Sequence, residues 1–458
     1  MQKTLLLKAL SILLLALLLM VPLAMIHGLV LERQNYLAQA TVDIANSYAG
    51  AQTLIGPVLI VPYQEEYRAN ELDPKTEKWR EVWRRQAKQV LIFPDTLNLS
   101  GNVDTSVKKR GLFPARVFAM QAHVSGTLTM PAELPFERRE KDSRIIVGQA
   151  YVSLGVSDPR GLAGAPQLEI DGTAAEFAQG AQLGQHSGIH APLAITANGK
   201  PQTLPYTLKL DLTGTERIGF VPLAGDTRID LQSSWPHPSF SGRFLPDPKT
   251  QSVTDSGFSA KWRIASLATS AQQQLMQIAS GTACRDSQCL DTLDVRFLDP
   301  VNIYTQADRA IKYDVLFVGL TFAAFFLFEV MKRLPVHPAQ YTLVGLALAM
   351  FFLLLLALSE HMAFDLAYLI AASACVGLVS FYLAGVLGGW RRGAGFGALL
   401  ATLYGALFGL LNSEDNALLM GALLLFGVLG LAMWLTRRFD WYALTLRATP
   451  TPTQAQSS

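Results

Sequence analysis

Hydrophobic residues in this chain form one isolated run near the N-terminus and a C-terminal block that is almost entirely apolar, with a region of mixed composition between them. The first run, residues 9–30, is long enough to cross a bilayer, which needs about 20 helical residues. Lys3 and Lys8 precede it, and its end lacks the small-residue cleavage site of a secretory signal. We predict an uncleaved transmembrane anchor over residues 1–30, with a signal sequence as the alternative.

Polar breaks divide the C-terminal block into five segments of roughly spanning length, at residues 315–331, 341–359, 363–388, 393–411 and 417–435. With the anchor, this predicts six transmembrane helices arranged as one plus five. The fifth span has Gly or Ala at every fourth position from Gly393 to Gly409, which predicts a flat face for close packing, with the fourth span as the expected neighbour.

Basic residues in the short connections predict the orientation, because Lys and Arg are retained on the cytoplasmic side. Along the chain, termini and connections that contain Lys or Arg alternate with connections that contain neither. The nine basic residues are Lys3, Lys8, Lys332, Arg333, Arg391, Arg392, Arg437, Arg438 and Arg447. Both termini are therefore expected in the cytoplasm and residues 31–312 outside it. The resulting domains are the anchor 1–30, an external domain 31–312, a five-helix bundle 313–436 and a cytoplasmic tail 437–458.

The external region begins with good helix formers over residues 32–48, which predict a helix continuing out of the membrane. Short runs rich in Val, Ile, Thr and aromatic residues follow, separated by Gly, Pro, Asn and Asp, a pattern typical of strands and turns. In residues 124–130 and 208–212 polar and apolar residues alternate, as half-buried strands require. We expect a large all-β, sandwich-like domain of antiparallel sheets, as one unit or as two subdomains, with residues 67–85 as an exposed loop or hairpin.

Charge and cysteines exclude some functions of this external region. Residues 31–312 contain 29 Lys plus Arg and 29 Asp plus Glu, a balance that argues against nucleic acid as a partner. Cys284 and Cys289 predict a disulfide closing a short polar loop, because their spacing is not that of a redox or zinc motif. Cys375 lies inside the fourth span, where a thiol is expected to be a packing residue. No metal or other cofactor is expected.

Residues 234–247 form the most unusual polar segment, with a histidine between two prolines, aromatic residues, an arginine and hydroxyls. The prolines predict a rigid loop and exclude a central strand. Trp235, His237, Phe240 and Arg243 are candidates for a contact surface, and the alternative is a packed corner with Trp235 and Phe240 buried. A catalytic interpretation, with His237 as a base beside a serine, lacks the expected nucleophile motif.

Ionisable residues of the membrane region are further candidates. Glu329 lies near the cytoplasmic end of the second span, three and four residues before Lys332 and Arg333, and so it is either paired there or functional. On the external side, the connections contain Glu360, His361, Asp365, Glu414 and Asp415. These residues either surround one mouth of the bundle or simply belong to two short wet loops.

Several segments resemble those of the CreD inner-membrane proteins of Gram-negative bacteria, and the resemblance spans essentially the whole chain. They are Ser234-Trp-Pro-His-Pro-Ser-Phe240 with Phe244-Leu-Pro246, Asp158-Pro-Arg-Gly161, Ala307-Asp-Arg-Ala-Ile-Lys-Tyr313, Leu356-Ala-Leu-Ser-Glu-His361, Leu410-Leu-Asn-Ser-Glu-Asp-Asn416 and Asp440-Trp-Tyr-Ala-Leu444. The resemblance implies an inner-membrane protein associated with envelope stress and envelope integrity, and it implies no reaction and no catalytic residues.

The sequence is compatible with two functions from different classes. The first is a non-enzymatic envelope protein that contacts membrane lipid and an envelope protein partner through its periplasmic domain. The second is a transporter or lipid-handling protein that works through the helix bundle. A periplasmic hydrolase is disfavoured, because the sequence offers no nucleophile, base and orienting residue as a set.

Overall fold

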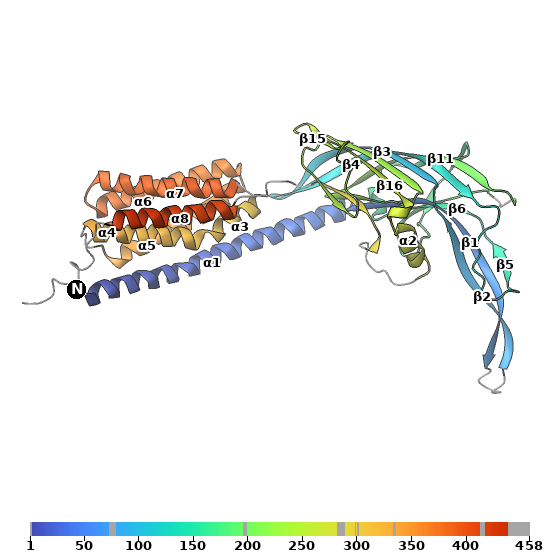
Figure 1. Ribbon diagram of the computed structural model, residues 1–458, viewed down its shortest axis with the longest axis horizontal. Coiled ribbons are helices and arrows are strands. Elements are labelled where there is room, and N and C mark those ends of the chain that lie inside the picture. Colours follow the sequence, from blue (N-terminus) through green and yellow to red (C-terminus); the bar gives the residue numbers. More distant parts are fainter. Residues whose placement is uncertain are drawn as a thin grey trace, which may run out of the picture. The chain divides into compact units, whose positions relative to one another are not determined.

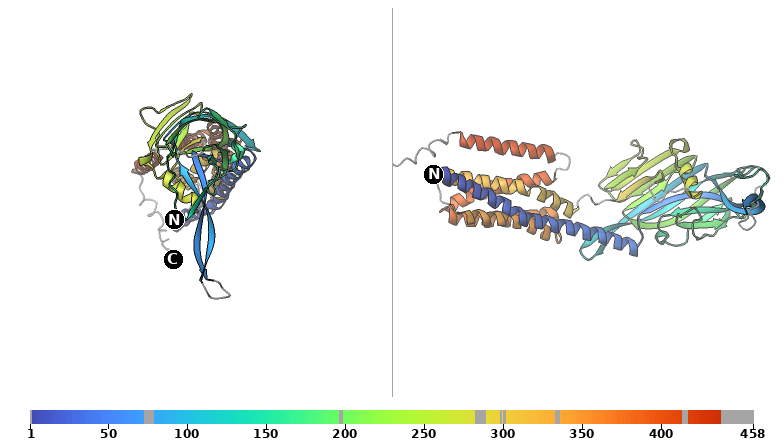
Figure 2. Two further views of the ribbon diagram at one scale, coloured as in Figure 1. Left: turned by 90° about the vertical axis from the view of Figure 1, so that its right-hand side faces the viewer. Right: turned by 90° about the horizontal axis from the view of Figure 1, so that it is seen from below.

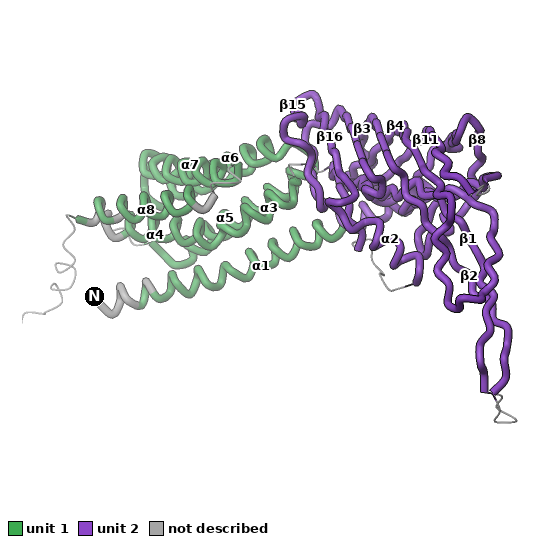
Figure 3. Tube along the Cα trace, turned by 45° about the vertical axis from the view of Figure 1, so that its right-hand side comes forward, with its two compact units in different colours: residues 1–36, 301–458 green, residues 37–300 purple. Residues whose placement is uncertain are grey.

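A computed structural model describes residues 2–72, 79–195, 199–281, 289–297, 299, 302–332, 336–412 and 417–437. The chain forms two compact units (Figure 3). The first combines residues 1–36 with residues 301–458, and the second contains residues 37–300.

Helix α1 (Gln2–Ser47) contributes to both units without a break. The predicted continuation of the first apolar span as a helix through residues 32–48 is therefore confirmed to Ser47. Because one uninterrupted helix leads from the apolar segment into the β-rich unit, the two units share a secondary-structure element as well as a covalent connection.

The first unit is helical (Figure 1). Among the described residues, α1, α5, α6 and α7 are each long and apolar enough to cross a membrane, and α3 with α4 qualify as a pair bent by 43°. Helix α8 contains a shorter apolar stretch, Leu419–Leu431. The C-terminal helices are α3 (Ile303–Lys312), α4 (Asp314–Lys332), α5 (Pro338–Ser359), α6 (Phe364–Val386), α7 (Trp390–Asn412) and α8 (Ala417–Thr436).

The small-residue face predicted on the fifth span does pack against the fourth, since α7 lies against α6. A Cβ atom added at Gly393 would lie 2.6 Å from the carbonyl oxygen of Ser380, and one added at Gly397 would meet the Ser380 hydroxyl. Side chains at these two positions would force the helices apart, so glycine allows the close approach. Gly405 has nothing within 4 Å, and the later part of α7 contacts α6 through larger side chains, since the Tyr368 hydroxyl donates to the Tyr404 carbonyl oxygen at 2.7 Å.

The second unit contains two sheets, of nine and eight strands among the described residues. Sheet A has the order β14-β17-β12-β1-β6-β10-β9, with β2 and β5 also paired to β1, and sheet B has the order β15-β16-β13-β3-β4-β11-β7-β8. The strands are β1 (Gln52–Leu72), β2 (Trp79–Ile92), β3 (Thr96–Arg110), β4 (Phe113–Met130), β5 (Arg144–Val147), β6 (Tyr151–Val156), β7 (Gln167–Ile170), β8 (Thr173–Ala175), β9 (Ala178–Gln179), β10 (Gly188–Pro192), β11 (Gln202–Thr215), β12 (Arg217–Val221), β13 (Asp226–Ser233), β14 (Pro238–Gly242), β15 (Ser252–Thr254), β16 (Gly257–Ala265) and β17 (Leu293–Phe297).

The expected antiparallel pairing holds for most neighbours but not for all. Strand β1 pairs with β12 in parallel, and β13 pairs with β3 in parallel. Parallel neighbours require a long crossover between the two strands, and here other strands of the domain lie within each crossover. Local alternation of polar and apolar residues identifies a strand but not its partner, so the sequence pattern could not reveal these two pairs.

The main core lies between the two sheets and confirms a large β-rich domain. It joins residues of sheet A, such as Leu59 and Val152, to residues of sheet B, such as Met120 and Leu231. A second cluster, containing Val58 of β1, places helix α2 (Ala271–Ala279) on the other face of sheet A. Leu59 and Val58 point to opposite sides because successive strand residues alternate.

The distal parts of β1 and β2 form a twisted two-stranded arm that projects from the sheets (Figures 1 and 2). The hairpin alternative predicted for residues 67–85 is the one observed where the structure describes them. Near its tip, Trp79 and Trp83 are 70% and 61% exposed. At the base of the arm the buried Glu65 carboxylate accepts hydrogen bonds from the Lys88 ammonium group at 2.8 Å and from the backbone N–H of Arg139 at 2.6 Å.

Candidate functional site

The segment 234–247 contains an edge strand. Residues 238–242 form β14, which among the described strands pairs with β17 alone, at the end of sheet A, so the prediction of a loop is wrong for these five residues. Pro238 is the first residue of the strand, and proline is tolerated there because an edge strand leaves one row of backbone groups unpaired. The expectation that a central strand is excluded agrees with this arrangement.

Trp235 is held in one position just before this strand. The guanidinium carbon of Arg116 lies 3.6 Å from the centroid of the Trp235 ring, and the indole N–H donates to the carbonyl oxygen of His237 at 3.0 Å. Arg116 is itself anchored by an ion pair with Asp299. The result is a half-buried aromatic side chain of fixed orientation beside an exposed His237.

The other two members of the predicted contact surface have different environments. Phe240 packs edge-on against Phe258 and Trp262, with ring centroids 5.6 Å and 5.7 Å away, so it anchors the strand to the core. The side chain of Arg243 is 69% exposed, and its Nε atom lies 3.6 Å from Asp291. Trp235, His237 and Arg243 are therefore the members available to a partner.

A second conspicuous motif, Asp158-Pro-Arg-Gly161, caps the C-terminal end of α1. Arg160 donates to the carbonyl oxygens of Asn46 and Ala45, and it forms a bidentate ion pair with Asp158 at 2.9 Å and 2.6 Å. These hydrogen bonds lower the pKa of Asp158 to about 2, against the opposing effect of its partial burial. A cation at a helix C-terminus is favourable because the last carbonyl groups have no partner within the helix. We call this arrangement the α1 cap.

Glu329 of α4 is buried, and it has three partners from other segments. Its carboxylate forms an ion pair with Lys8 of α1, accepts a hydrogen bond from the Tyr341 hydroxyl at 2.8 Å, and accepts a weaker one from the backbone N–H of Val336 at 3.4 Å. Lys8 also donates to the carbonyl oxygen of Val336 at 2.7 Å. This group ties α1 to α4 and α5, a contact that sequence spacing could not indicate because it joins residues 321 positions apart.

The remaining polar candidates of the membrane region have different environments where the structure describes them. Glu360 accepts from the Tyr304 hydroxyl at 3.3 Å and lies 3.4 Å from Arg33. His361 and Asp365 are exposed. Glu414 and Asp415 lie outside the described residues, so a common mouth of five groups stays a prediction, and so does the Cys284–Cys289 disulfide because Cys284 also lies outside them. Within the described part of the chain, no group of three His, Cys, Asp or Glu residues could hold a metal ion.

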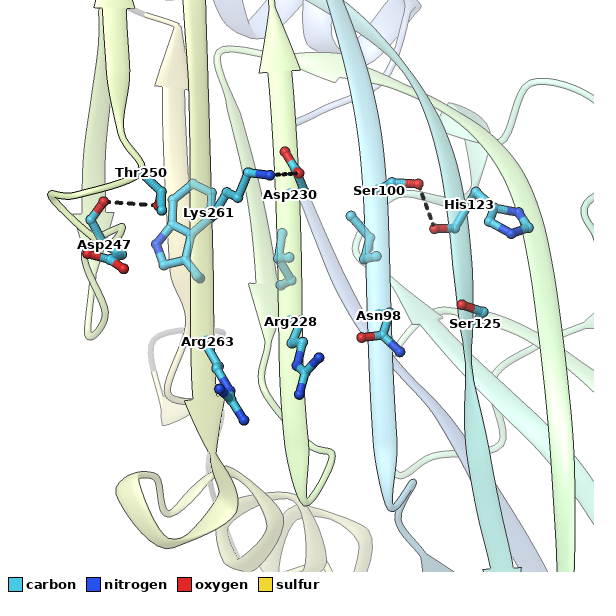
Figure 4. Close-up of a pocket in the computed structure, with 13 residues that line it drawn as sticks. Asn98, Ser100, His123, Ser125, Arg228, Asp230, Asp247, Thr250, Lys261 and Arg263 are labelled. Atoms are coloured by element: carbon cyan, nitrogen blue, oxygen red, sulfur yellow. Dashed lines mark hydrogen bonds and ion pairs between the residues drawn. The ribbon is translucent and has the colours of Figure 1, made fainter.

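The outer face of sheet B contains a hollow that sequence reasoning missed (Figure 4). Two adjoining hollows of about 430 Å³ and 550 Å³ share Ser100, His123 and Asp230. We call the combined depression the β3 trough, because short side chains of β3 form its floor. The floor is Asn98, Ser100 and Asn102, and the flanking residues are Arg228, Asp230 and Gln232 of β13 and Gln121, His123 and Ser125 of β4.

The charged residues around the β3 trough are paired with one another. Asp226 lies 2.7 Å from Arg228 and 3.4 Å from Arg263, and Asp230 lies 2.7 Å from Lys261. Burial tends to raise the pKa of Asp226, but hydrogen bonds from the two arginines lower it below its usual value. The amide side chains of Asn98, Asn102, Gln121 and Gln232 have no hydrogen-bond partner among the described residues.

The comparisons with known proteins place the chain in a family. Residues 4–442 match the family described as Inner membrane protein CreD. The chain is 35% identical over 436 residues to Inner membrane protein CreD of Escherichia coli (strain K12), covering 94% of this chain and 92% of that protein. Among solved structures, native leukotriene A4 hydrolase from Saccharomyces cerevisiae aligns with a TM-score of 0.21 at 12% identity, over 49% of this chain and 34% of that one. By the first two matches, this chain belongs to the CreD family of inner membrane proteins.

Proposed function

We propose that this inner-membrane protein supports the integrity of the cell envelope through contacts of its β-rich domain with another envelope protein, without catalysing a reaction. The family match supports an envelope role. The observation that carries the contact mechanism is the fixed Trp235 side chain, stacked on Arg116 beside the exposed His237. A side chain ordered before binding loses little conformational entropy on binding, and tryptophan and arginine are the residues that most often dominate interface energies.

The proposal includes a topology. Helices α1, α4, α5, α6, α7 and α8 would each cross the membrane, both termini would lie in the cytoplasm, and residues 31–312 would lie in the periplasm. The alternation of nine basic residues between connections supports this orientation. In the β-rich unit, Leu267 is 99% exposed and so is a suitable labelling position.

The topology is tested by labelling single cysteines with a membrane-impermeant maleimide. Each variant has its three native cysteines replaced by serine and carries either Leu267→Cys or Thr451→Cys. In cells with a permeabilised outer membrane and an intact inner membrane, we expect labelling at position 267 only, and at both positions after lysis. Labelling of Thr451→Cys before lysis would contradict the proposed orientation.

The contact surface is tested by in-cell crosslinking from a photoreactive residue at position 237. We expect one defined envelope protein to be captured, and we expect Trp235→Ala to reduce the capture at least tenfold. A photoreactive residue at position 267, which is also exposed, is the matched control and should not capture that protein. The double variant Trp235→Ala with His237→Ala should lose envelope function at normal protein level, and a functional, folded double variant would overturn this choice of surface.

The structure gives less support to a transporter or lipid-handling function of the helix bundle. Of its three candidate carboxylates in the described residues, Glu329 and Glu360 each have partners from other helices, and Asp365 is exposed at the start of α6. Carboxylates paired in this way hold helices together, whereas a transport site needs groups that a substrate or ion can reach. We therefore place the function in the β-rich domain.

A further inference from the structure

The β3 trough has the form of a binding site for an extended ligand. Its floor follows one strand, where Asn98, Ser100 and Asn102 point outward at every second position. Side chains of this kind repeat along a strand at about 6.6 to 6.8 Å, so the floor offers equivalent groups at a regular interval. Longer side chains of the neighbouring strands, including Arg228 and His123, stand on either side of the short ones (Figure 4).

The residues on the floor are poorly suited to a strand. Asparagine is depleted in strands, whereas β-branched and aromatic residues are favoured there. Asn98 and Asn102 nevertheless occupy outward positions of β3, a strand with neighbours on both sides. Residues with a low propensity for the element in which they lie are expected mainly at functional positions. The two asparagines in β3 therefore indicate a role for their amide groups.

The charge of the trough excludes an anionic ligand as its main occupant. The lining has four basic residues, Lys209, Arg228, Lys261 and Arg263, and three acidic residues, Asp211, Asp230 and Asp247. Asp226 beside it pairs with Arg228 and Arg263, which brings the net charge to 4 − 4 = 0. Three of the basic groups are already paired within the sheet. Phosphate recognition requires uncompensated positive charge, and the trough does not supply it.

The hydrogen-bonding capacity that remains is neutral. Each primary amide offers two donors and a carbonyl acceptor, and the four amides of the trough have no partner among the described residues.

We propose that the β3 trough binds a neutral saccharide chain that carries acetamido groups. Hydroxyl groups both donate and accept, and an acetamido group presents one N–H and one carbonyl oxygen, which the Asn and Gln amides match in both directions. A peptide fits less well, because a central sheet face offers no free backbone edge for strand addition. Sheet-based folds also provide saccharide sites elsewhere, as in lectin jelly rolls and OB-folds.

This inference uses the proposed periplasmic placement only to bring the site and the sugar together in the cell, because binding itself is a property of the purified protein. The test is isothermal titration calorimetry of the full-length protein in lipid nanodiscs, which avoid sugar-based detergents. The probe is chitohexaose, the β-1,4-linked hexamer of N-acetylglucosamine. Maltohexaose, which has the hydroxyl groups but no acetamido groups, is the comparison sugar.

We expect chitohexaose to bind and maltohexaose to bind at least tenfold more weakly. The double variant Asn98→Ala with Asn102→Ala should weaken chitohexaose at least tenfold, and Ser100→Trp, which fills the floor from an exposed position, should abolish binding. Thr207→Ala is the matched control, because Thr207 lies on the same face of sheet B outside the trough and should bind as the wild type does.

Three outcomes overturn the proposal. The wild type could fail to bind chitohexaose at 10 mM, on the order of the weakest affinity a specific site would show. Binding could survive both trough variants, which would place it elsewhere. Maltohexaose could bind equally well, which would remove the role of the amides. None of these outcomes bears on the crosslinking from position 237 or on the labelling of position 267, so failure here is distinct from failure of the proposed function.

Discussion

Replacing Glu65 by glutamine should destabilise the β-rich domain by removing a buried negative charge at the base of the arm. The side chain of Glu65 is fully buried, whereas that of its partner Lys88 is 20% exposed. Lys88 also donates to the carbonyl oxygen of Glu137 at 2.9 Å, so the pair joins the arm to the segment that follows β4. Glutamine keeps the shape of the side chain and removes only its charge, which isolates the electrostatic contribution.

The size of the effect follows from the pKa of the carboxyl group. Burial by itself raises the pKa of Glu65, but hydrogen bonds from Lys88 and from the backbone N–H of Arg139 outweigh burial and lower it from 4.5 to about 2. At about 1.4 kcal/mol per pKa unit this corresponds to roughly 3 kcal/mol as an upper limit. Removing one partner of a buried pair costs about 3 to 5 kcal/mol, and glutamine retains part of the hydrogen bonding. We therefore expect a loss of about 2 to 3 kcal/mol.

The sign of the pH dependence is fixed by the direction of this shift. Because the folded-state pKa is lower than the unfolded-state value, the contribution of Glu65 is fully present above about pH 5 and is lost as the pH falls toward 2. Glutamine does not titrate. The stability difference between the wild type and Glu65→Gln should therefore be largest near pH 7 and should shrink at pH 3.

The assay is thermal unfolding of the full-length protein, followed by the circular dichroism of the β-rich domain. A domain of this size loses about 2 to 4 °C in Tm for each kcal/mol, so we expect Glu65→Gln to melt roughly 5 to 10 °C lower at pH 7. Glu81→Gln is the matched control, because Glu81 forms an ion pair with Arg68 in the same arm with both side chains more than 60% exposed. Such pairs contribute about 0 to 1 kcal/mol. A Tm for Glu65→Gln within 2 °C of the wild type, or a difference that does not shrink at pH 3, would refute the reasoning.

Three further perturbations address contacts between elements. Arg160→Met removes the cation from the α1 cap, and the backbone amides of the last turn of α1 should exchange with deuterium at least tenfold faster by mass spectrometry. Lys8→Met leaves the Glu329 carboxylate buried without its cation and should lower the Tm of the helical unit, whereas adding Glu329→Leu should recover most of the loss, because an apolar pair replaces a buried ion pair at little cost. Gly397→Leu should lower the same Tm by several degrees, because its Cβ meets α6.

Matched variants separate these effects from general damage. Arg110→Met removes an exposed ion pair with Asp43, so it should leave the exchange at the end of α1 within twofold of the wild type. Gly405→Leu is the control for Gly397→Leu, because it adds the same side chain to the same helix at a position where an added Cβ has no atom within 4 Å. It should not change the Tm. If Lys8→Met with Glu329→Leu were no more stable than Lys8→Met alone, the charge argument would fail.

The sequence predicted the classes of element better than their neighbours. Runs of apolar residues located the membrane helices, and period-two alternation located strands such as β11, because both signals are local. The pairing of β1 with β12 joins residues about 165 positions apart along the chain, and nothing in either strand specifies that partner. Strand β14 differs from its prediction for another reason: Pro238 excludes a central strand, but proline is tolerated as the first residue of an edge strand.

The candidate sites show the same limit. The compositional peculiarity of residues 234–247 draws attention to Trp235, but the fixed orientation of this side chain depends on Arg116 of β4 and on Asp299, neither of which stands out in the sequence. Glu329 was expected near Lys332 and Arg333 on its own helix, and the observed partner is Lys8 of α1. In each case the candidate residue was visible in the sequence, and its partner was not.

The β3 trough extends this reasoning to a site whose residues carry no motif at all. Asn98, Ser100 and Asn102 do not stand out in the sequence. In the sheet, β3 lies between β13 and β4, and the short side chains of these three residues form the floor of the trough. The signal that could have identified them was the occurrence of two asparagines on the outward face of one strand, which opposes strand propensity. Local sequence therefore identifies residues that have a low propensity for the strand in which they lie. Only the register of the sheet shows that several such residues line the same surface depression.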